Sequence, residues 1–91
     1  MPEWDEAKRA ANRRKNGVDF SEEALFDWNT ALVVEDDRYD YGELRLRAFG
    51  FIRGRLYVMV FTPRGRDVRI ISLRKAKARE VRWYEEEWRK A

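Results

Sequence analysis

The stretch from Asp67 to Tyr84, DVRIISLRKAKAREVRWY, most constrains what this chain can fold into. Its first part, Asp67 to Leu73, is rich in β-branched residues, which favour a strand. From Lys75 onward the apolar residues recur at spacings of three and four, which predicts a helix. We expect the functional surface where strand meets helix, because basic residues gather there with few acids. These residues are Arg69, Arg74, Lys75, Lys77 and Arg79.

The charge of the chain is unevenly divided between its two halves. Residues 1–43 hold 6 Lys and Arg and 12 Asp and Glu, a balance of −6. Residues 44–91 hold 14 Lys and Arg and 5 Asp and Glu, a balance of +9. This asymmetry favours an anionic partner for the second half. The alternative is that the two halves neutralise each other across the fold.

The first 30 residues predict two helices. One covers Trp4 to Asn16, with Asp5 as its N-cap and Gly17 as a left-handed C-terminal stop. The exposed side of this helix is basic. A second, short helix begins at Phe20, with Ser21 as its cap, and ends near Trp28.

The remaining residues predict four strands on short turns, over 31–35, 43–51, 55–62 and 67–73. Two of these turns are predicted at Arg53-Gly54 and at Pro63-Arg64-Gly65. Such turns imply an antiparallel sheet. The run LYVMVF, residues 56–61, is apolar on both faces and is therefore expected to form a central strand. The predicted fold class is α+β, a compact single domain over residues 1–91 with the order α-α-β-β-β-β-α. The helices are expected to pack on one face of the sheet.

Composition limits the chemistry. Histidine and cysteine are both absent, so a Ser-His triad, thiolate chemistry and the commonest metal ligands are excluded. No P-loop or dinucleotide motif is present. The acidic run Glu35-Asp36-Asp37 is expected to be a solvated loop rather than a metal site. We expect no metal and no cofactor. No apolar stretch approaches about 20 residues, and the chain is expected to be cytoplasmic.

Phosphoryl transfer within RNA is compatible with the side chains that remain. The nucleophile is the substrate's own 2′-hydroxyl, so the protein has to orient the backbone and stabilise the charge on the phosphorane. Arginine suits this task, because its planar guanidinium matches two phosphate oxygens. Glu, Lys or Tyr can transfer protons if their neighbours shift their pKa values.

Several segments, in order, resemble the BrnT family, the toxin half of BrnT–BrnA type II toxin–antitoxin modules. They are EWDEAKRAAN, KNGVDF followed by EALFD, GELRLRAFG, VRIISLRKAKARE and the late Tyr84-Glu85, and they span about Glu3 to Glu86. The resemblance implies a RelE-like ribonuclease fold that acts on RNA and inhibits translation. It also implies a BrnA-like, ribbon-helix-helix antitoxin, which neutralises the toxin and represses the shared operon with it.

The resemblance assigns catalytic roles to five positions: Glu43, Arg45, Arg74, Glu80 and Tyr84. Six further residues are expected to bind RNA: Lys8, Arg47, Arg69, Lys75, Lys77 and Arg79. The chain departs from the family pattern at Asn16, where the family usually has histidine, at Leu73, where a small residue is common, and at Val81 and Trp83 in the last helix.

Structural roles remain open for several of these residues. Instead of binding RNA, Arg45 and Arg47 could each form a structural ion pair with Glu43 or Glu35. Glu80 suits a salt bridge within its helix as well as a base. Tyr84 lies on the apolar stripe of its helix and suits core packing as well as catalysis. For the chain as a whole, the alternative function is a non-catalytic module that binds nucleic acid or the ribosome.

The four tryptophans are many for a domain of this size. We expect Trp28, Trp83 or Trp88 to contribute to an uncovered aromatic patch, since such residues anchor interfaces. A partner protein, or a second copy of the chain in its absence, is expected to cover that patch.

Overall fold

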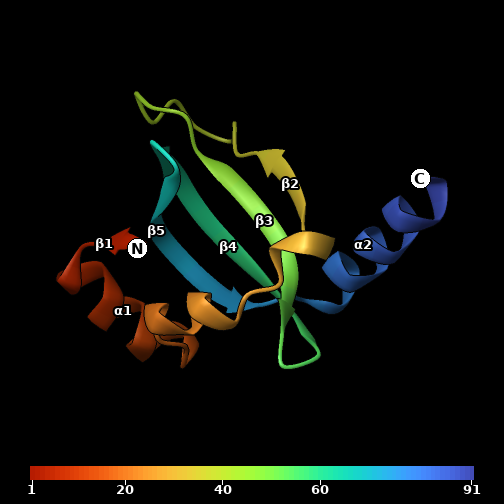
Figure 1. Cartoon of the computed structure of the whole chain (residues 1–91), viewed down its shortest axis with the longest axis horizontal. Helices are drawn as coiled ribbons and strands as arrows, with labels where there is room; N and C mark the ends of the chain where they lie inside the picture. The colour runs from red at the N-terminus through yellow and green to blue at the C-terminus, as the bar shows by residue number, and fades with distance from the viewer.

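The computed structural model describes residues 1–91 and has five strands in one sheet, in the order β1-β5-β4-β3-β2 (Figure 1). The strands are β1 (Glu3–Trp4), β2 (Leu32–Glu35), β3 (Leu46–Ile52), β4 (Arg55–Arg64) and β5 (Asp67–Lys75). The helices are α1 (Glu6–Asn16), the 3-10 helices η1 (Phe20–Leu25) and η2 (Trp28–Thr30), and α2 (Ala78–Lys90). The α+β class is confirmed. The prediction of a four-stranded, purely antiparallel sheet is wrong, because β1 adds a fifth strand that pairs with β5 in parallel.

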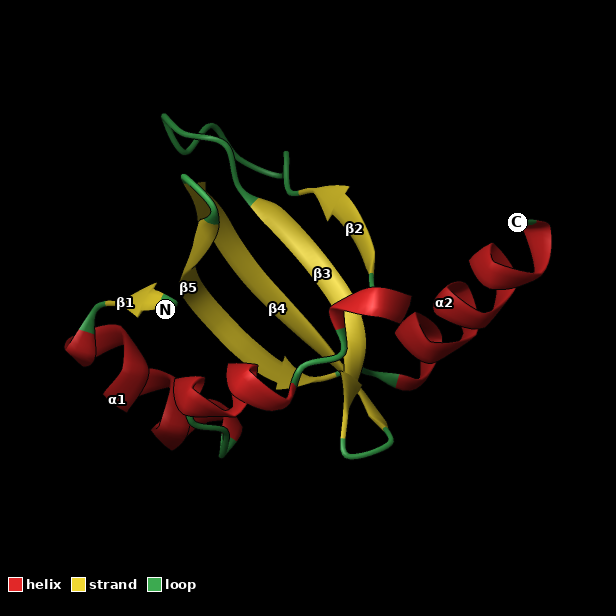
Figure 2. Ribbon diagram, in the orientation of Figure 1, coloured by secondary structure: helices red, strands yellow, loops and turns green.

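The two faces of the sheet are covered by different helices, so the prediction that all helices pack on one face is wrong. β4 is central, as predicted, and its side chains alternate between two cores. Tyr57 and Met59 join a cluster that includes Phe20 of η1. Leu56 and Val58 join a second cluster with residues of α2. In Figure 2, α1 and η1 lie at the lower left of the sheet, and α2 lies at the opposite end of the view, to the right of β2 and β3.

The two predicted helices in the first 30 residues are only partly confirmed. In α1, the Asp5 carboxylate accepts a hydrogen bond from the Ala7 amide at 2.7 Å, and Gly17 is left-handed with φ 70°. Trp4 belongs to β1 instead of the helix. The second helix is 3-10 and follows Asp19, and the Ser21 hydroxyl donates to the Asp19 carboxylate instead of capping.

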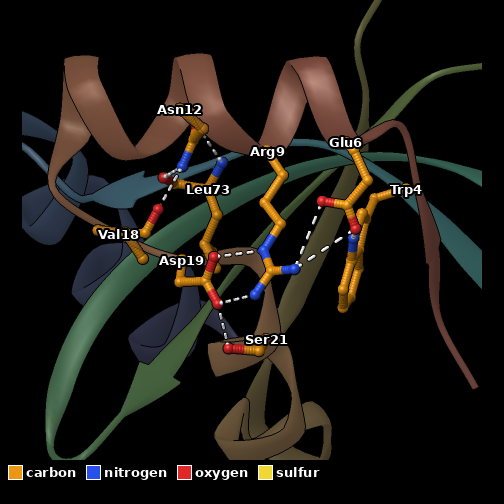
Figure 3. A network of polar contacts seen from close by, with 8 residues as sticks. All are labelled: Trp4, Glu6, Arg9, Asn12, Val18, Asp19, Ser21 and Leu73. Carbon is orange, nitrogen blue, oxygen red and sulfur yellow. Dashed lines mark hydrogen bonds and ion pairs between the residues drawn. The ribbon is translucent and has the colours of Figure 1, made fainter.

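The inner side of α1 contacts the sheet through a polar residue (Figure 3). Asn12 is buried, and its amide nitrogen donates to the carbonyl of Val18 at 2.9 Å and to that of Leu73 at 2.8 Å. Its oxygen accepts from the Leu73 amide at 3.1 Å. Asn16 donates to the same oxygen at 2.8 Å and so supports this network.

A second polar contact on this side of the sheet connects α1 to the start of η1. Arg9 binds the Asp19 carboxylate with two hydrogen bonds of 2.6 and 2.9 Å and lies near the Glu6 carboxylate, to which Trp4 also donates (Figure 3). These bonds lower the pKa of Asp19 below its ordinary value. The start of η1 is thereby fastened to α1.

A β-bulge in β5 decides which of its side chains face α2. Ser72 pairs with Val60 and Ile70 pairs with Phe61, so Ile71 is an extra residue. Ile70 and Leu73 consequently both point into the core on the α1 side. Strict alternation from Ile70 would have placed Arg74 on that side too. The bulge instead turns Ser72 and Arg74 to the α2 side.

Other boundaries differ by a few residues. The Arg53-Gly54 hairpin turn is confirmed, since both residues have positive φ, 49° and 77°. Pro63 and Arg64 are still in β4, whereas the sequence predicted a turn there. Lys75 ends β5 instead of beginning the helix. None of the helices is both long enough and apolar enough to span a membrane.

Candidate functional site

Only part of the α2 side of the sheet is covered by the helix. Phe49 and Val58 pack with Tyr84 and with the half-buried Trp83. The next cross-strand row on this side consists of Val34, Arg47, Val60 and Ser72, all half-buried. We call this row, together with Arg45, Arg69 and Arg74 on the same side of the strands, the open face. It therefore carries four arginines on a rigid sheet.

Arg74 is the arginine held most firmly. Its two terminal nitrogens each donate to one oxygen of the Glu80 carboxylate, both at 2.8 Å. The Glu80 oxygen Oε1 also accepts from the Lys77 amide at 2.8 Å, which caps α2. Arg74 and Glu80 are 31% and 14% exposed at their side chains. The end of β5 and the start of α2 are thus joined by one carboxylate.

This pairing changes the acidity of Glu80. Hydrogen bonds from Arg74, more than any other influence, lower its pKa from 4.5 to about 2, although burial acts in the opposite direction. A carboxylate with so low a pKa is a weak base. The salt bridge expected from the sequence was within the helix, whereas the observed partner of Glu80 is Arg74 of β5. The geometry favours a role for Glu80 in positioning Arg74.

Arg47 and Arg79 border a cavity of about 440 Å³ beside this pair. Neither arginine has an ion-pair partner, unlike Arg74. The Nε atom of Arg47 is buried and has no hydrogen-bond partner within the protein. A cation that the protein itself leaves unsatisfied suits an anionic ligand. The cavity is lined by Val34, Arg47, Phe49, Arg79, Glu80 and Trp83.

The loop between β2 and β3 adds charged and aromatic groups to the same side of the sheet. Asp36 is buried, with only 1% of its side chain exposed, and Arg38 binds it at 2.7 and 3.0 Å. Arg38 lowers the pKa of Asp36, and Arg47 adds to the effect. The Arg45 guanidinium lies 3.9 Å from the centre of the Tyr41 ring. The expectation of a solvated acidic loop is therefore wrong at Asp36.

Two of the predicted catalytic residues lie away from the cavity. Glu43 is exposed and lies 3.6 Å from Arg64, near the turn between β4 and β5. Tyr84 is buried, and its hydroxyl donates to the Thr30 carbonyl at 2.6 Å. The structure therefore does not bring either side chain to Arg74 and Arg47.

The predicted RNA-binding residues are distributed over several surfaces. Arg47 and Arg79 line the cavity. Arg69 lies on the open face, 3.4 Å from Glu3 of β1. Lys75, at the end of β5, and Lys77, at the N-cap of α2, are both exposed. Lys8 is exposed on α1, which packs on the other side of the sheet.

Several site residues were not found from the sequence. Val34, Phe49 and Trp83 reach the cavity because of strand register and helix placement, neither of which has a local sequence signal. Asp36, Arg38 and Tyr41 belong to a loop without periodicity. No group of three or more His, Cys, Asp or Glu side chains is arranged to hold a metal.

The fold and the site together define a small α+β protein with an arginine-lined sheet face. A family model described as "Ribonuclease toxin, BrnT, of type II toxin-antitoxin system" matches residues 4–80. The chain belongs to this family of ribonuclease toxins, which confirms the resemblance noted from the sequence. Membership implies a cognate antitoxin as partner. A search of curated proteins found no match.

Proposed function

We propose that the chain is an endoribonuclease that binds RNA on the open face and cleaves it without a metal ion. One observation carries the proposal: in a chain of a ribonuclease toxin family, Arg47 and Arg79 line one cavity beside the Arg74–Glu80 pair. The expected consequence in a cell is inhibition of translation.

The reaction needs little from the protein beyond orientation and charge. The 2′-oxygen attacks the adjacent phosphorus, the bond from phosphorus to the 5′-oxygen breaks, and a 2′,3′-cyclic phosphate and a 5′-hydroxyl end result. One proton leaves the 2′-hydroxyl and one reaches the departing oxygen. Negative charge grows on the non-bridging oxygens, where Arg47 and Arg74 would stabilise it.

Each of the three groups predicted to move these two protons has another partner in the structure. Glu80 has a pKa of about 2, the Tyr84 hydroxyl is bound to a carbonyl, and Glu43 lies near Arg64. We retain Glu43, Glu80 and Tyr84 as candidates to be tested. Their positions favour the second candidate function, a non-catalytic module that binds RNA or the ribosome on the same face.

The test is to incubate the purified chain with RNA and to map new 5′ ends. We expect Arg47→Ala to lower cleavage by about a hundredfold or more, as loss of a transition-state donor does. Arg82→Ala is the matched control, because Arg82 is exposed on α2 and outside the cavity. Melting temperature is measured for each variant.

The two candidate functions give different results. If no new 5′ ends are found but the RNA affinity falls steeply as the salt concentration rises, the chain is a non-catalytic binding module. The expected log-log slope is about 0.7 for each neutralised phosphate of a single strand. Affinity that barely changes with salt contradicts both functions.

We propose that the cognate antitoxin is a BrnA-like, ribbon-helix-helix protein that neutralises the toxin, and that the toxin reaches operator DNA only within their complex. Support comes from the family and from an uncovered apolar surface. Trp88 and Leu25 are 44% and 50% exposed, and they border a groove of about 940 Å³ together with Phe51.

The groove suggests where to test antitoxin binding. Trp88→Glu is expected to weaken the complex with the antitoxin and to leave RNA cleavage by the free toxin unchanged, because Trp88 lies outside the arginine-lined cavity. If the free chain self-associates and Trp88→Glu abolishes this, the surface is instead an interface between two copies of the chain.

A further inference from the structure

The cavity beside Arg47 contains more apolar surface than phosphate binding requires. Its volume of about 440 Å³ lies within the range of small-ligand sites. Val34 of β2, Phe49 of β3 and Trp83 of α2 form the apolar part of its lining, and Arg47 and Arg79 supply the positive charge. An anion alone gains nothing from an aromatic wall, so the lining points to a ligand with both a charged and a planar apolar part.

Trp83 is the largest apolar side chain in this lining. Its ring packs on Phe49, with the ring centres 4.7 Å apart and the planes inclined by 54°. Even so, Trp83 is only half-buried, while Phe49 is buried. Phe49 therefore supports the indole from within the sheet, and part of the indole surface remains accessible from the cavity. A supported aromatic ring of this kind suits stacking.

We infer that this cavity holds one unpaired nucleobase of the bound RNA, stacked on Trp83, with the adjoining phosphates bound by Arg47 and Arg79. The inference rests on the proposed function and names the state of the substrate at the site. The base has to be unpaired, because a paired base in a duplex does not offer a free face to an inserted ring.

The polar groups around the cavity indicate that stacking, and not the identity of the base, determines binding there. The Glu80 carboxylate is already occupied by Arg74 and by the Lys77 amide. The two remaining guanidinium groups are assigned to phosphate. Glu80 is the one side-chain acceptor in the lining, and its three hydrogen bonds hold it to Arg74 and to the start of α2, so it is not positioned to read a base edge. The subsite therefore tolerates all bases and prefers purines only through their larger stacking surface.

The test compares two ligands of five nucleotide units that cannot be cleaved, since each 2′-oxygen is methylated. One carries a base on every unit and the other is abasic throughout, so both have the same phosphates. We expect the full chain to bind the first ligand about tenfold to a hundredfold more tightly than the abasic one. Affinity is measured by the anisotropy of a dye on the ligand.

Two variants locate the effect. Trp83→Leu keeps an apolar contact for Phe49 but removes the stacking ring, and should lose most of the preference for the base-bearing ligand. Binding of the abasic ligand should be unchanged. Trp83→Phe should restore part of the preference. Trp88→Leu is the control on the same helix, since Trp88 lines the other groove, and should behave as wild type.

Each alternative outcome has a distinct meaning. Equal affinity of the wild-type chain for both ligands overturns the base subsite and leaves RNA binding through phosphates in place. A Trp83→Leu variant that weakens both ligands equally shows that Trp83 is structural, and also overturns it. If neither ligand binds, the proposed RNA-binding function fails together with the subsite.

Discussion

The two faces of the sheet are stabilised by different means. On the α1 side, apolar residues such as Phe20 and Met59 are completely buried, and the polar atoms of Asn12 are satisfied by backbone. On the α2 side, a row of half-buried residues remains open, and Arg45 and Arg47 each have a buried nitrogen without a partner. One side is thus optimised for stability, while the other keeps cations available at some cost to stability.

Removing Asn12 should have the largest effect on the closed side. Asn12→Ala leaves the Val18 carbonyl and the Leu73 amide without a partner, and the Leu73 carbonyl keeps only a 3.5 Å hydrogen bond from Asn16. The free energy of unfolding should fall by about 3 kcal/mol. For a domain of this size each kcal/mol lowers the melting temperature by about 4–8 °C. Calorimetry of Asn12→Ala and of Asn16→Ala, which removes only the outer part of the network, provides the comparison.

RNA affinity at a temperature where Asn12→Ala is folded should match that of the wild type, because Asn12 lies away from the open face. If Asn12→Ala kept its melting temperature but lost RNA affinity, the division between the two faces would be contradicted.

Gly50 tests how tightly the closed side is packed. A Cβ atom at Gly50 would lie 2.4 Å from the Phe26 ring, closer than van der Waals contact allows. Gly50→Ala should therefore cost about 1–3 kcal/mol of unfolding free energy, as overpacking does. The double variant with Phe26→Leu should recover part of this loss. Urea denaturation of the two single variants and the double variant measures the coupling, and strict additivity would show that the ring does not cause the strain.

The Arg74–Glu80 pair makes stability depend on pH in a definite direction. The folded-state pKa of Glu80 is about 2 and its ordinary value is 4.5, so the contribution is complete above pH 4.5 and is lost as the pH falls toward 2. We expect it to amount to about 1–2 kcal/mol, since solvent screens the exposed side of the pair. The difference in unfolding free energy between wild type and Glu80→Gln, followed from pH 7 to pH 2, should shrink over this range.

Other carboxylates with lowered pKa values, Asp19, Asp36 and Asp67, titrate in both proteins and cancel in this difference. A difference that stays constant from pH 7 to pH 2 would show that Glu80 contributes no charge-dependent stability.

The smallest expected effect is on the open face. Arg47→Met replaces a side chain whose buried Nε lacks a partner by an apolar one of similar length. Stability should be unchanged or raised by up to about 1 kcal/mol, while RNA affinity falls. Thermal melting and salt-dependent binding of the same sample measure both. A loss of more than about 2 kcal/mol would indicate that Arg47 is part of the structural network, as Asn12 is.

Local signals in the sequence were sufficient for much of the fold. The cap at Asp5 was predicted because its short side chain can accept a hydrogen bond from the first turn of the helix. The stop at Gly17 and the turn at Arg53-Gly54 were predicted because a positive φ is adopted by few residues other than glycine. The central position of β4 was predicted from its apolar residues on both faces. The same observation implies a cover on each face, and therefore helices on both.

The rest depended on contacts that are distant in the sequence. β1 has two residues and gives no periodic signal. The bulge at Ile71 was hidden in a run of β-branched residues, and without it the direction of Arg74 could not be predicted. The partner of Arg74, Glu80, caps a helix that follows Lys77, which is not a usual capping residue, so the pair had no recognisable motif.

The side chain of Asn12 has a consequence for how the protein behaves at high concentration. The outer margin of β5 is paired with β1 at Arg69 and Ile70, and further along Asn12 occupies the amide and the carbonyl of Leu73. A strand from another molecule could extend the sheet at this margin only by displacing both β1 and the Asn12 side chain. The other margin, β2, is only four residues long, ends at the exposed Glu35 and is followed closely by the exposed Asp37. Both margins are thus protected against edge-to-edge aggregation, one by a side chain that substitutes for a strand and the other by brevity and charge.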